Sequence, residues 1–496
     1  MFFYYITANN KSMDMKSIWE TSLKTQEKEY DFLKSDIRRD IVVIGSGISG
    51  ILTAFGLTEQ GYKVTLVEAE KLYGGVTSKT TAHICSQQGY IYYDLKKNKP
   101  EGWAKLYFSS QQQAIDEYEK LIKREKIDCG FERVNDYFFT EKNLQKLKEL
   151  YGILKDIGAK VKFYDSKSVL GFDTKGVIKA ENQAMFNPLE FLAQLKKIFE
   201  IFESTRILKI DMKSKILYTK KYQIKANKII IATNYPIVKL KGAYFLKLYK
   251  SHSYAVASKE IEKSLNGIYN SDVDNGFTFR EFNNKIIIGG LDHRTGRVNN
   301  NFKKQKLKEI AKECFNAEIT NYWNANDVIT YDGLPIVGRF SKKYKDVYII
   351  TGFNKWGMAN SMASSLLITN LIAGKQNGFE KIFSPQRFNF RLGAFLSNLY
   401  VSIKNLIITP LIPAFKSYKN LKAGEGKIVC YNGAKKAVYK DDKGVYHICS
   451  PYCKHLHCQL KFNSNSKTWD CPCHGSRYDI DGNIITSPTV EKLDEN

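Results

Sequence analysis

The stretch Asp40-Ile-Val-Val-Ile-Gly-Ser-Gly-Ile-Ser-Gly50 decides the fold of this chain. Residues 41–44 are a short β-branched run that ends at a glycine, which is typical of a strand buried on both faces. A helical pattern follows to Gly61, and a second apolar run, 64–67, leads to Glu68. In this context of strand, helix, strand and acid, a Gly-x-Gly-x-x-Gly pattern predicts a dinucleotide-binding βαβ unit.

The three glycines of this pattern have separate physical roles. Gly45 permits a tight turn, Gly47 lets the main chain approach a pyrophosphate, and Gly50 lets the helix pack closely on the strand. The pyrophosphate is expected at the helix N-terminus, where N–H groups and the helix dipole favour an anion. Glu68 is placed to accept hydrogen bonds from ribose hydroxyls. The predicted contacts of this unit are Gly45, Ser46, Gly47, Ile48, Ser49, Gly50, Glu68 and Ala69.

Later segments select the cofactor. A small, hydroxyl-rich segment, Gly74–Ala82, follows the second strand, and Ile229–Pro236, Asp332–Gly338 and Thr351–Met358 come later. In this order the segments resemble motifs of the D-amino-acid oxidase and glycine oxidase family. The resemblance implies FAD and the removal of a hydride from a C–N or similar bond. It adds as cofactor contacts Thr77, Thr80, Thr81, Ala82, Ala232, Thr233, Gly352, Phe353, Trp356, Gly357 and Met358.

The same resemblance implies the domain organisation. It covers roughly residues 38–384 and implies an α/β flavin domain of the glutathione-reductase-like type with a discontinuous antiparallel-sheet substrate domain. The expected pieces are a lead-in at 1–37, flavin-binding segments at about 38–95, 175–240 and 325–384, and a substrate domain at about 96–174 and 241–324. A length of 496 residues is compatible with such a division into two or three domains.

The C-terminal region contains a cysteine and histidine pattern. Cys453-Lys-His455 is followed by Cys471-Pro-Cys473-His474. Two thiolates and two imidazoles are the ligands of a Rieske [2Fe–2S] cluster, although zinc also accepts mixed nitrogen and sulfur ligands. The pattern resembles the Rieske domain, which we place at 426–496 as a small all-β unit.

That resemblance implies a role for each residue of the pattern. Cys453 and Cys471 would ligate one iron, and His455 and His474 the other. It further implies a disulfide between Cys458 and Cys473, and hydroxyl groups of Ser476 and Tyr478 beside the cluster and cysteine sulfur; these features count against zinc. His457 stands where the family usually has glycine.

Composition limits the remaining possibilities. The net charge is +25, but the lysines are scattered and basic recognition blocks are missing, so nucleic acid is not an expected partner. The charge permits peripheral association with an anionic membrane surface or an acidic electron-transfer partner. Residues 1–10 lack the features of a secretory signal, and we expect a cytoplasmic protein. The connector, 385–425, is apolar over 395–415, but Lys404 and prolines interrupt it, which favours a surface helix over a membrane span.

The resulting functional hypothesis joins two cofactors. We expect a dehydrogenase that oxidises a small amine, amino acid or related molecule and passes electrons through the cluster to an external acceptor, either a redox protein or the quinone pool. An oxygen-using oxidase with a regulatory cluster and an electron-transfer module fed by a partner protein are the alternatives. Arg280 is the candidate for binding a substrate carboxylate, with a structural role equally open. His83 and His252 are further candidates, each with a structural role favoured.

Overall fold

The computed structural model describes residues 16–25, 28–166, 168–261, 265–272, 276–297, 303–387, 392–415 and 417–494, so the first fifteen residues of the predicted lead-in lie outside it. The predicted βαβ unit is present as β1 (Ile37–Ile44), α2 (Ile48–Glu59) and β2 (Val64–Val67). β1 pairs in parallel with β2 on one side and with β12 (Gln223–Ile231) on the other. All four apolar residues of 41–44 are buried, as the pattern predicts.

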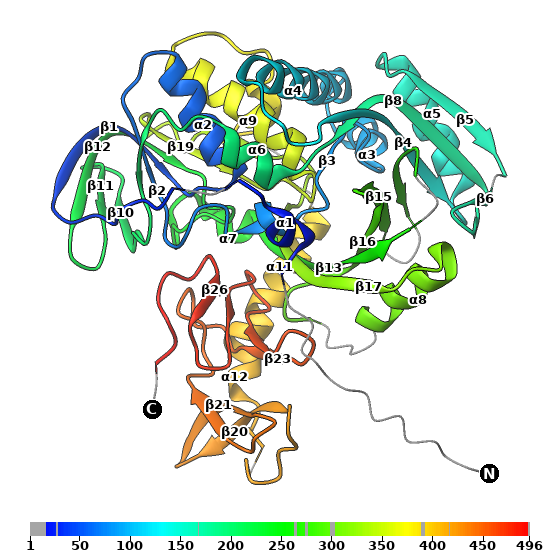
Figure 1. Ribbon diagram of the computed structural model, residues 1–496. Coiled ribbons are helices and arrows are strands. Elements are labelled where there is room, and N and C mark those ends of the chain that lie inside the picture. The colour runs from blue at the N-terminus through cyan, green and yellow to red at the C-terminus, as the bar shows by residue number, and fades with distance from the viewer. Residues whose placement is uncertain are drawn as a thin grey trace, which may run out of the picture.

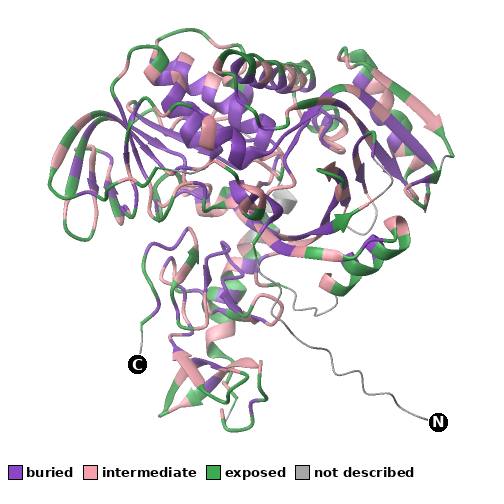
Figure 2. Ribbon diagram, in the orientation of Figure 1, coloured by how far each residue is buried: buried purple, intermediate pink, exposed green. Residues whose placement is uncertain are grey.

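An eight-stranded sheet is built on this unit within the described residues (Figure 1). Its remaining strands are β9 (Glu200–Phe202), β10 (Lys209–Asp211), β11 (Ile216–Tyr218), β18 (Ile336–Arg339) and β19 (Val347–Thr351). Helices α2 and α9 (Gly357–Ile372) pack against each other over one face, and Figure 2 shows both as largely buried. Helix α6 (Pro188–Gln194) has Pro188 in its first turn and the Asn187 side chain as its N-cap.

A second sheet of nine strands in the described chain corresponds to the predicted substrate domain. Its strands are β3 (His83–Ile84), β4 (Glu132–Thr140), β5 (Val161–Asp165), β8 (Gly176–Met185), β13 (Leu248–Glu260), β14 (Gly267–Ser271), β15 (Phe277–Phe282), β16 (Lys285–Arg294) and β17 (Ile319–Thr330). Helices α5 (Leu144–Asp156) and α8 (Lys303–Phe315) pack on this sheet, and α3 (Ile91–Asn98) packs on α5. The long strand β13 pairs with β16 on one edge and with β17 on the other. Its side chains point alternately to the two faces of the sheet.

Two elements differ from the predicted division. Strand β8, expected in a flavin-binding segment, pairs with β4 and β5 in the substrate sheet. Helix α4 (Trp103–Glu125), expected in the substrate domain, packs on α9 and donates from the Tyr118 hydroxyl to the Met358 carbonyl at 3.0 Å. In both cases contacts with residues far away in the sequence determine which domain the element joins, because neither sequence pattern specifies its partner.

The chain then passes through a helical connector into the C-terminal domain. The connector contains α11 (Leu392–Ile403), a π-helical turn at Lys404–Ile408 and α12 (Thr409–Leu411). No helix among the described residues is long and apolar enough to cross a membrane. The C-terminal domain has two small sheets. They are formed by β20 (Gly426–Tyr431), β21 (Ala434–Lys440) and β22 (Tyr446–Cys449), and by β23 (Lys461–Asn463), β24 (Thr468–Asp470), β25 (Arg477–Tyr478) and β26 (Ile484–Thr486).

Short elements complete the described fold. They are α1 (Ile18–Ser22), α7 (Tyr244–Lys247), α10 (Glu380–Phe383), the 3-10 turns Val76–Lys79 and Lys241–Ala243, and the strand pair β6 (Ser168–Val169) and β7 (Phe172–Asp173). The C-terminal domain lies below the two larger domains in Figure 1, with β26 turned toward them.

Candidate functional site

The glycine loop after β1 has the conformation that its sequence predicts. Gly45 has φ +105°, and a Cβ added there would lie 2.6 Å from the Ala232 carbonyl oxygen. A Cβ at Gly50 would lie only 2.0 Å from the Gly45 oxygen, so close helix–strand packing requires glycine at this position. At Gly47 the nearest atom to an added Cβ is the Thr77 Oγ1 at 3.5 Å, which leaves open space in front of the helix.

A cavity of about 470 Å³ lies against this loop. Glu68 closes β2 at its wall and accepts from the Ser46 N–H and hydroxyl, both at 2.8 Å. Two buried polar groups on the wall, the Ser361 hydroxyl and the Asn326 side-chain nitrogen, have no hydrogen-bond partner in the described chain. Buried donors are normally satisfied, so these groups fit a polar ligand. The predicted contacts on this wall are Gly45, Ser46, Gly47, Ile48, Ser49, Glu68, Ala69, Thr77, Thr80, Ala232, Thr233, Gly352, Phe353, Gly357 and Met358.

A larger cavity of about 780 Å³ shares part of its wall with the first. Thr81 and Trp356, also predicted as cofactor contacts, line it, and so does His83. Gly50 and Ala82 lie on neither wall. Gly50 acts through packing, and Ala82, which is buried with φ +60°, shapes the turn that carries its neighbours.

The larger cavity has charged side chains of both signs. Arg294, Arg297 and Lys355 supply positive charge, and Asp292 and Asp327 supply negative charge. Asp292 is already engaged, with its carboxylate 2.7 Å from the Lys355 ammonium and accepting from the Ser251 hydroxyl at 3.1 Å.

Asp327 is the second carboxylate of this wall, and it also reaches the smaller cavity. Burial raises the pKa of Asp327 to about 6 against the lowering effect of Lys355, while Asp292 adds to the rise. A carboxylate with this pKa changes charge near neutral pH and can accept a proton.

Arg280 does not line either cavity. Its guanidinium is buried and donates to the main-chain carbonyls of Thr81, Ala82 and Phe186 at 3.3, 2.7 and 3.2 Å. Its charge also lies 5.3 Å from the centre of the Trp19 ring. This placement does not support the predicted binding of a substrate carboxylate and assigns Arg280 to the structure of the Thr81–Ala82 turn.

The two candidate histidines lie on different sides of the substrate sheet. His83 is on the cavity wall with the Thr278 hydroxyl 3.2 Å from its Nδ1. His252 lies on the opposite face of β13 from the cavity residues Ser251 and Ser253. Burial, and then the charge of Arg477 in the C-terminal domain, lower the pKa of His252 well below its usual value. His252 therefore belongs to the domain contact rather than to the cavity.

The four predicted cluster ligands converge in the C-terminal domain. Cys453 and Cys471 are buried free thiols, and the rings of His455 and His474 lie 5.0 Å apart. All four imidazole nitrogens are buried without a hydrogen-bond partner among the described residues. Burial lowers the pKa of His455 to about 4 and, with the His455 charge, that of His474 to about 3, so both rings are neutral at pH 7. Neutral imidazole is the form that ligates a metal, and the set fits the cluster.

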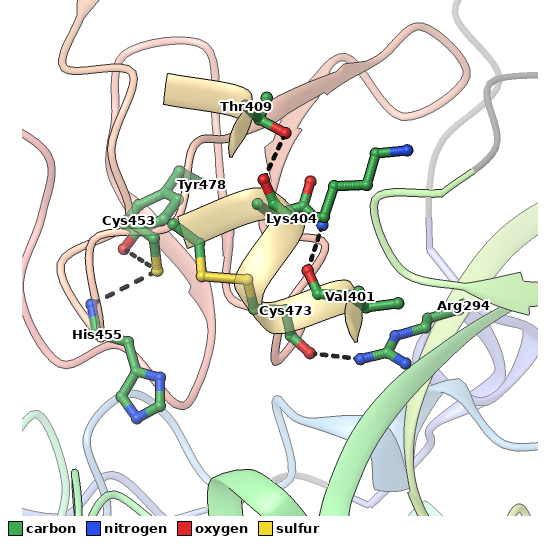
Figure 3. The surroundings of a disulfide bond; sticks show 10 residues. Arg294, Val401, Lys404, Thr409, Cys453, His455, Cys473 and Tyr478 are labelled. Atoms are coloured by element: carbon green, nitrogen blue, oxygen red, sulfur yellow. Dashed lines mark hydrogen bonds between the residues drawn. A yellow bond between two sulfur atoms is a disulfide. The ribbon is translucent and has the colours of Figure 1, made fainter. Parts of the chain in front are cut away.

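The predicted supporting residues lie close to these ligands, and Figure 3 shows Cys473 and Tyr478 near Cys453 and His455. Cys458 and Cys473 form a disulfide, as the resemblance implied. The Tyr478 hydroxyl lies 3.5 Å from the Cys453 sulfur and accepts from the Lys454 N–H at 3.1 Å. The Ser476 hydroxyl is buried and accepts from the Thr489 N–H at 3.2 Å.

His457 is exposed and has φ +61°, in the left-handed region. This conformation gives a physical reason for the glycine that the family usually carries at the position.

The histidine ligands face the flavin domain. The Tyr235 ring, which follows the end of β12, lies 6.3 Å from both the His455 and the His474 rings. Arg294 Nη2 donates to the Cys473 carbonyl at 2.9 Å (Figure 3). The histidine side of the cluster site is therefore covered by residues of the larger domains.

The C-terminal domain also forms part of the smaller cavity. Residues 484–487, 489 and 490 line it together with Arg477. The buried Lys250 ammonium donates to the Thr486 hydroxyl at 2.8 Å and the Ser487 carbonyl at 2.6 Å. A Cβ added at Gly475 would lie 2.4 Å from the Lys250 Cβ, which shows how closely the domains pack.

This combination of a dinucleotide cavity, an adjoining charged cavity and a two-cysteine, two-histidine site defines a redox protein with two cofactors. The chain belongs to the FAD dependent oxidoreductase family, whose profile matches residues 40–371, and residues 413–495 match the Rieske [2Fe-2S] domain. It is accordingly an oxidoreductase with FAD and a [2Fe–2S] cluster, and the zinc alternative is set aside.

Similar proteins share this organisation in whole or in part. A Bacillus subtilis (strain 168) protein, YhfW, described by its name as a Rieske 2Fe-2S iron-sulfur protein, is 31% identical over 96% of this chain and 97% of its own length. Gamma-glutamylputrescine oxidoreductase of Escherichia coli (strain K12) is 19% identical over 73% of this chain and 90% of its own. The structure of glycine oxidase from Geobacillus kaustophilus superposes with a TM-score of 0.61 at 18% identity, over 71% of this chain and all of that one.

Several residues of the site were not predicted as such. Arg294 and Asp292 follow Gly289-Gly290 directly at the end of β16, and Asp327 lies near the end of β17. Charged residues at the ends of strands that roof a pocket could have indicated them. Tyr235 and Lys250 carry no comparable signal, because their role depends on how the C-terminal domain docks.

Proposed function

We propose that this protein is a dehydrogenase that oxidises a small amine, amino acid or related molecule and releases the electrons through its Rieske domain to an external acceptor, a redox protein or the quinone pool. When bound, FAD accepts a hydride and the cluster carries electrons one at a time. The observation that carries the proposal is the burial of His455 and His474 against Tyr235 of the flavin domain, in a C-terminal domain that also lines the flavin cavity.

The charged cavity supports a substrate that has both an amine and an acid group. Arg294 and Arg297 offer guanidinium groups to a carboxylate, which they bind in a fork geometry. Asp327 accepts a proton from a substrate ammonium when its carboxylate is ionised, above a pKa of about 6. The name of the relative gamma-glutamylputrescine oxidoreductase also favours a small amine or amino-acid derivative.

The residues at the domain contact support direct communication between the two sites. Lys250 holds the segment that closes over the smaller cavity, and Arg294 joins the larger cavity to the carbonyl of Cys473, next to His474. Electron transfer slows steeply with distance, so a fixed contact on the histidine side favours transfer inside one molecule.

Anaerobic mixing of the holoenzyme with a panel of amino acids and amines tests the proposal. We expect one substrate class to bleach the flavin absorbance, followed by appearance of the electron paramagnetic resonance signal of the reduced cluster. Bleaching without any cluster signal, with stoichiometric hydrogen peroxide formed in air, would show an oxidase instead. Failure of every small molecule to reduce a fully loaded protein that a chemical reductant does reduce would favour a module fed by another protein.

A further inference from the structure

An exposed apolar patch lies on the connector that leads to the Rieske domain. Of the fourteen exposed large hydrophobic side chains in the described chain, nine fall within residues 396–415. We call these nine the connector patch; Ile407, at 55% exposed, and Leu411, at 78%, belong to it. Scattered exposed hydrophobic residues need no explanation, but such a concentration indicates an interaction surface.

Seven of the nine residues lie on a continuous helical run, and Ile412 and Phe415 follow it. α11, the π-helical turn and α12 span residues 392–411, or roughly 30 Å at the usual rise of a helix. One side of this run is fixed to the protein, because Val401 and Asn405 are buried and the Asn405 carbonyl accepts from the Gln459 N–H at 3.2 Å. Figure 2 shows exposed residues along this run beside the Rieske domain, so the helix lies on the protein with one side uncovered.

The charged residues along the connector sequence, up to Gly424, have one sign. Residues 382–424 contain no Asp or Glu, although the whole chain has 51 acidic residues. The same stretch has six basic residues, of which Lys404, Lys419 and Lys422 are exposed. A helix with an apolar side and basic residues matches the interface of a bilayer that contains anionic lipid.

We propose that the connector patch docks this protein on an anionic lipid membrane, with the apolar side chains at the acyl boundary and the lysines among the headgroups. A second copy of the chain is a poorer occupant, since a symmetric contact would bring the same lysines together with no acidic residue in this stretch to pair them. The proposal goes beyond the proposed dehydrogenase activity. It places the loop of the Cys458–Cys473 disulfide directly behind the docking helix, because Gln459, next to Cys458, donates to the Asn405 carbonyl on the buried side of that helix.

Flotation of the full-length holoprotein with lipid vesicles tests this proposal. We expect binding to phosphatidylcholine vesicles that contain phosphatidylglycerol, and little binding to phosphatidylcholine alone. Ile407→Glu should lower the bound fraction at least about tenfold, since it puts a charge into the apolar side. The matched control is Ile198→Glu on the flavin domain, where an isoleucine of 54% exposure receives the same change and binding should remain.

The contribution of the lysines to vesicle binding is measured separately. Replacing Lys404, Lys419 and Lys422 by Gln should weaken vesicle partitioning about fivefold for each lysine near the surface, and added salt should do the same to the unchanged protein. Flavin absorbance and the cluster signal establish that each variant is folded. Equal binding by the two glutamate variants overturns the proposal. So does a lipid-free dimer that only Ile407→Glu dissociates, which would assign the patch to self-association.

Discussion

Arg294 donates from Nη2 to the main-chain carbonyl of Cys473 at 2.9 Å, so one side chain belongs to both redox sites (Figure 3). On the flavin side Arg294 lines the charged cavity. On the Rieske side Cys473 is disulfide-bonded to Cys458 and precedes the predicted ligand His474. A substrate that binds the Arg294 guanidinium is therefore expected to perturb the loop that carries His474.

Arg294→Gln should change both sites. The Michaelis constant for a carboxylate substrate should rise by at least about tenfold, the order of a charged hydrogen bond. The paramagnetic signal of the reduced cluster should also shift without substrate, because the Cys473 carbonyl loses its donor. Arg297→Gln is the control: it lines the same cavity and should alter only the Michaelis constant. An unchanged cluster signal in Arg294→Gln would show that Arg294 does not couple the cavity to the cluster site.

The pH dependence of turnover should report Asp327. Burial raises the pKa of this carboxyl to about 6, so the proton-accepting form is present above that pH and is lost as pH falls through it. We expect kcat/KM to decline on the acid side with an apparent pKa near 6. Asp327→Asn should lower kcat/KM by roughly 10²- to 10⁴-fold, the range for general-base catalysis, and remove this limb of the profile. Persistence of the same limb in Asp327→Asn assigns it to another group.

Gly47→Val should abolish retention of FAD while the chain still folds. A Cβ at Gly47 meets only the Thr77 hydroxyl at 3.5 Å, so the obstruction is to the cofactor and not to the protein. Gly152→Val serves as the control, since nothing lies within 4 Å of a Cβ added there. Flavin absorbance per mole of purified protein measures the outcome, and full stoichiometry in Gly47→Val would contradict this placement of the pyrophosphate.

Tyr478→Phe should lower the reduction potential of the cluster and leave its iron content unchanged. The hydroxyl lies 3.5 Å from the Cys453 sulfur, where a hydrogen bond stabilises the more negative, reduced state. Redox titration followed by paramagnetic resonance gives the potential, and metal analysis gives the iron. The conclusion fails if the potential is the same with and without the hydroxyl.

Arg280→Lys should destabilise the fold without changing substrate preference. The guanidinium donates from Nη1 to three carbonyls and from Nε to the Glu281 carbonyl, and a single ammonium nitrogen cannot occupy both donor positions. We expect a loss of about 1–3 kcal/mol in the free energy of unfolding, the cost of a disrupted buried donor set. Thermal unfolding measures the loss. A selective rise in the Michaelis constant for carboxylate substrates, with stability intact, would restore the binding role first considered for this residue.

Arg280 also shows where sequence reasoning reaches its limit. It lies on strand β15 (Phe277–Phe282), two residues after Thr278 and therefore on the same face of the sheet. Thr278 lines the cavity, whereas the Arg280 guanidinium is covered by the carbonyls of Thr81, Ala82 and Phe186. Whether this residue could reach the cavity thus depended on how distant segments pack over the strand. Composition and spacing along the strand do not specify that packing.

The sequence by itself determined both cofactor motifs. The unit β1–α2–β2 is contiguous, and the tight packing at Gly50 involves the Gly45 carbonyl of the same unit. The four cluster ligands come from two short loops whose spacing is fixed by the chain. Local backbone geometry and the chemistry of the ligand atoms are enough to identify such motifs, because few conformations satisfy both requirements.

Only the tertiary structure decided how the two redox sites meet. Lys250 holds Ser487 across 237 positions of sequence, and Tyr235 covers two histidines from another domain. Each residue is unremarkable within its own segment. Their roles arise because docking removes water from both surfaces and leaves each buried polar group dependent on a partner that no local pattern encodes.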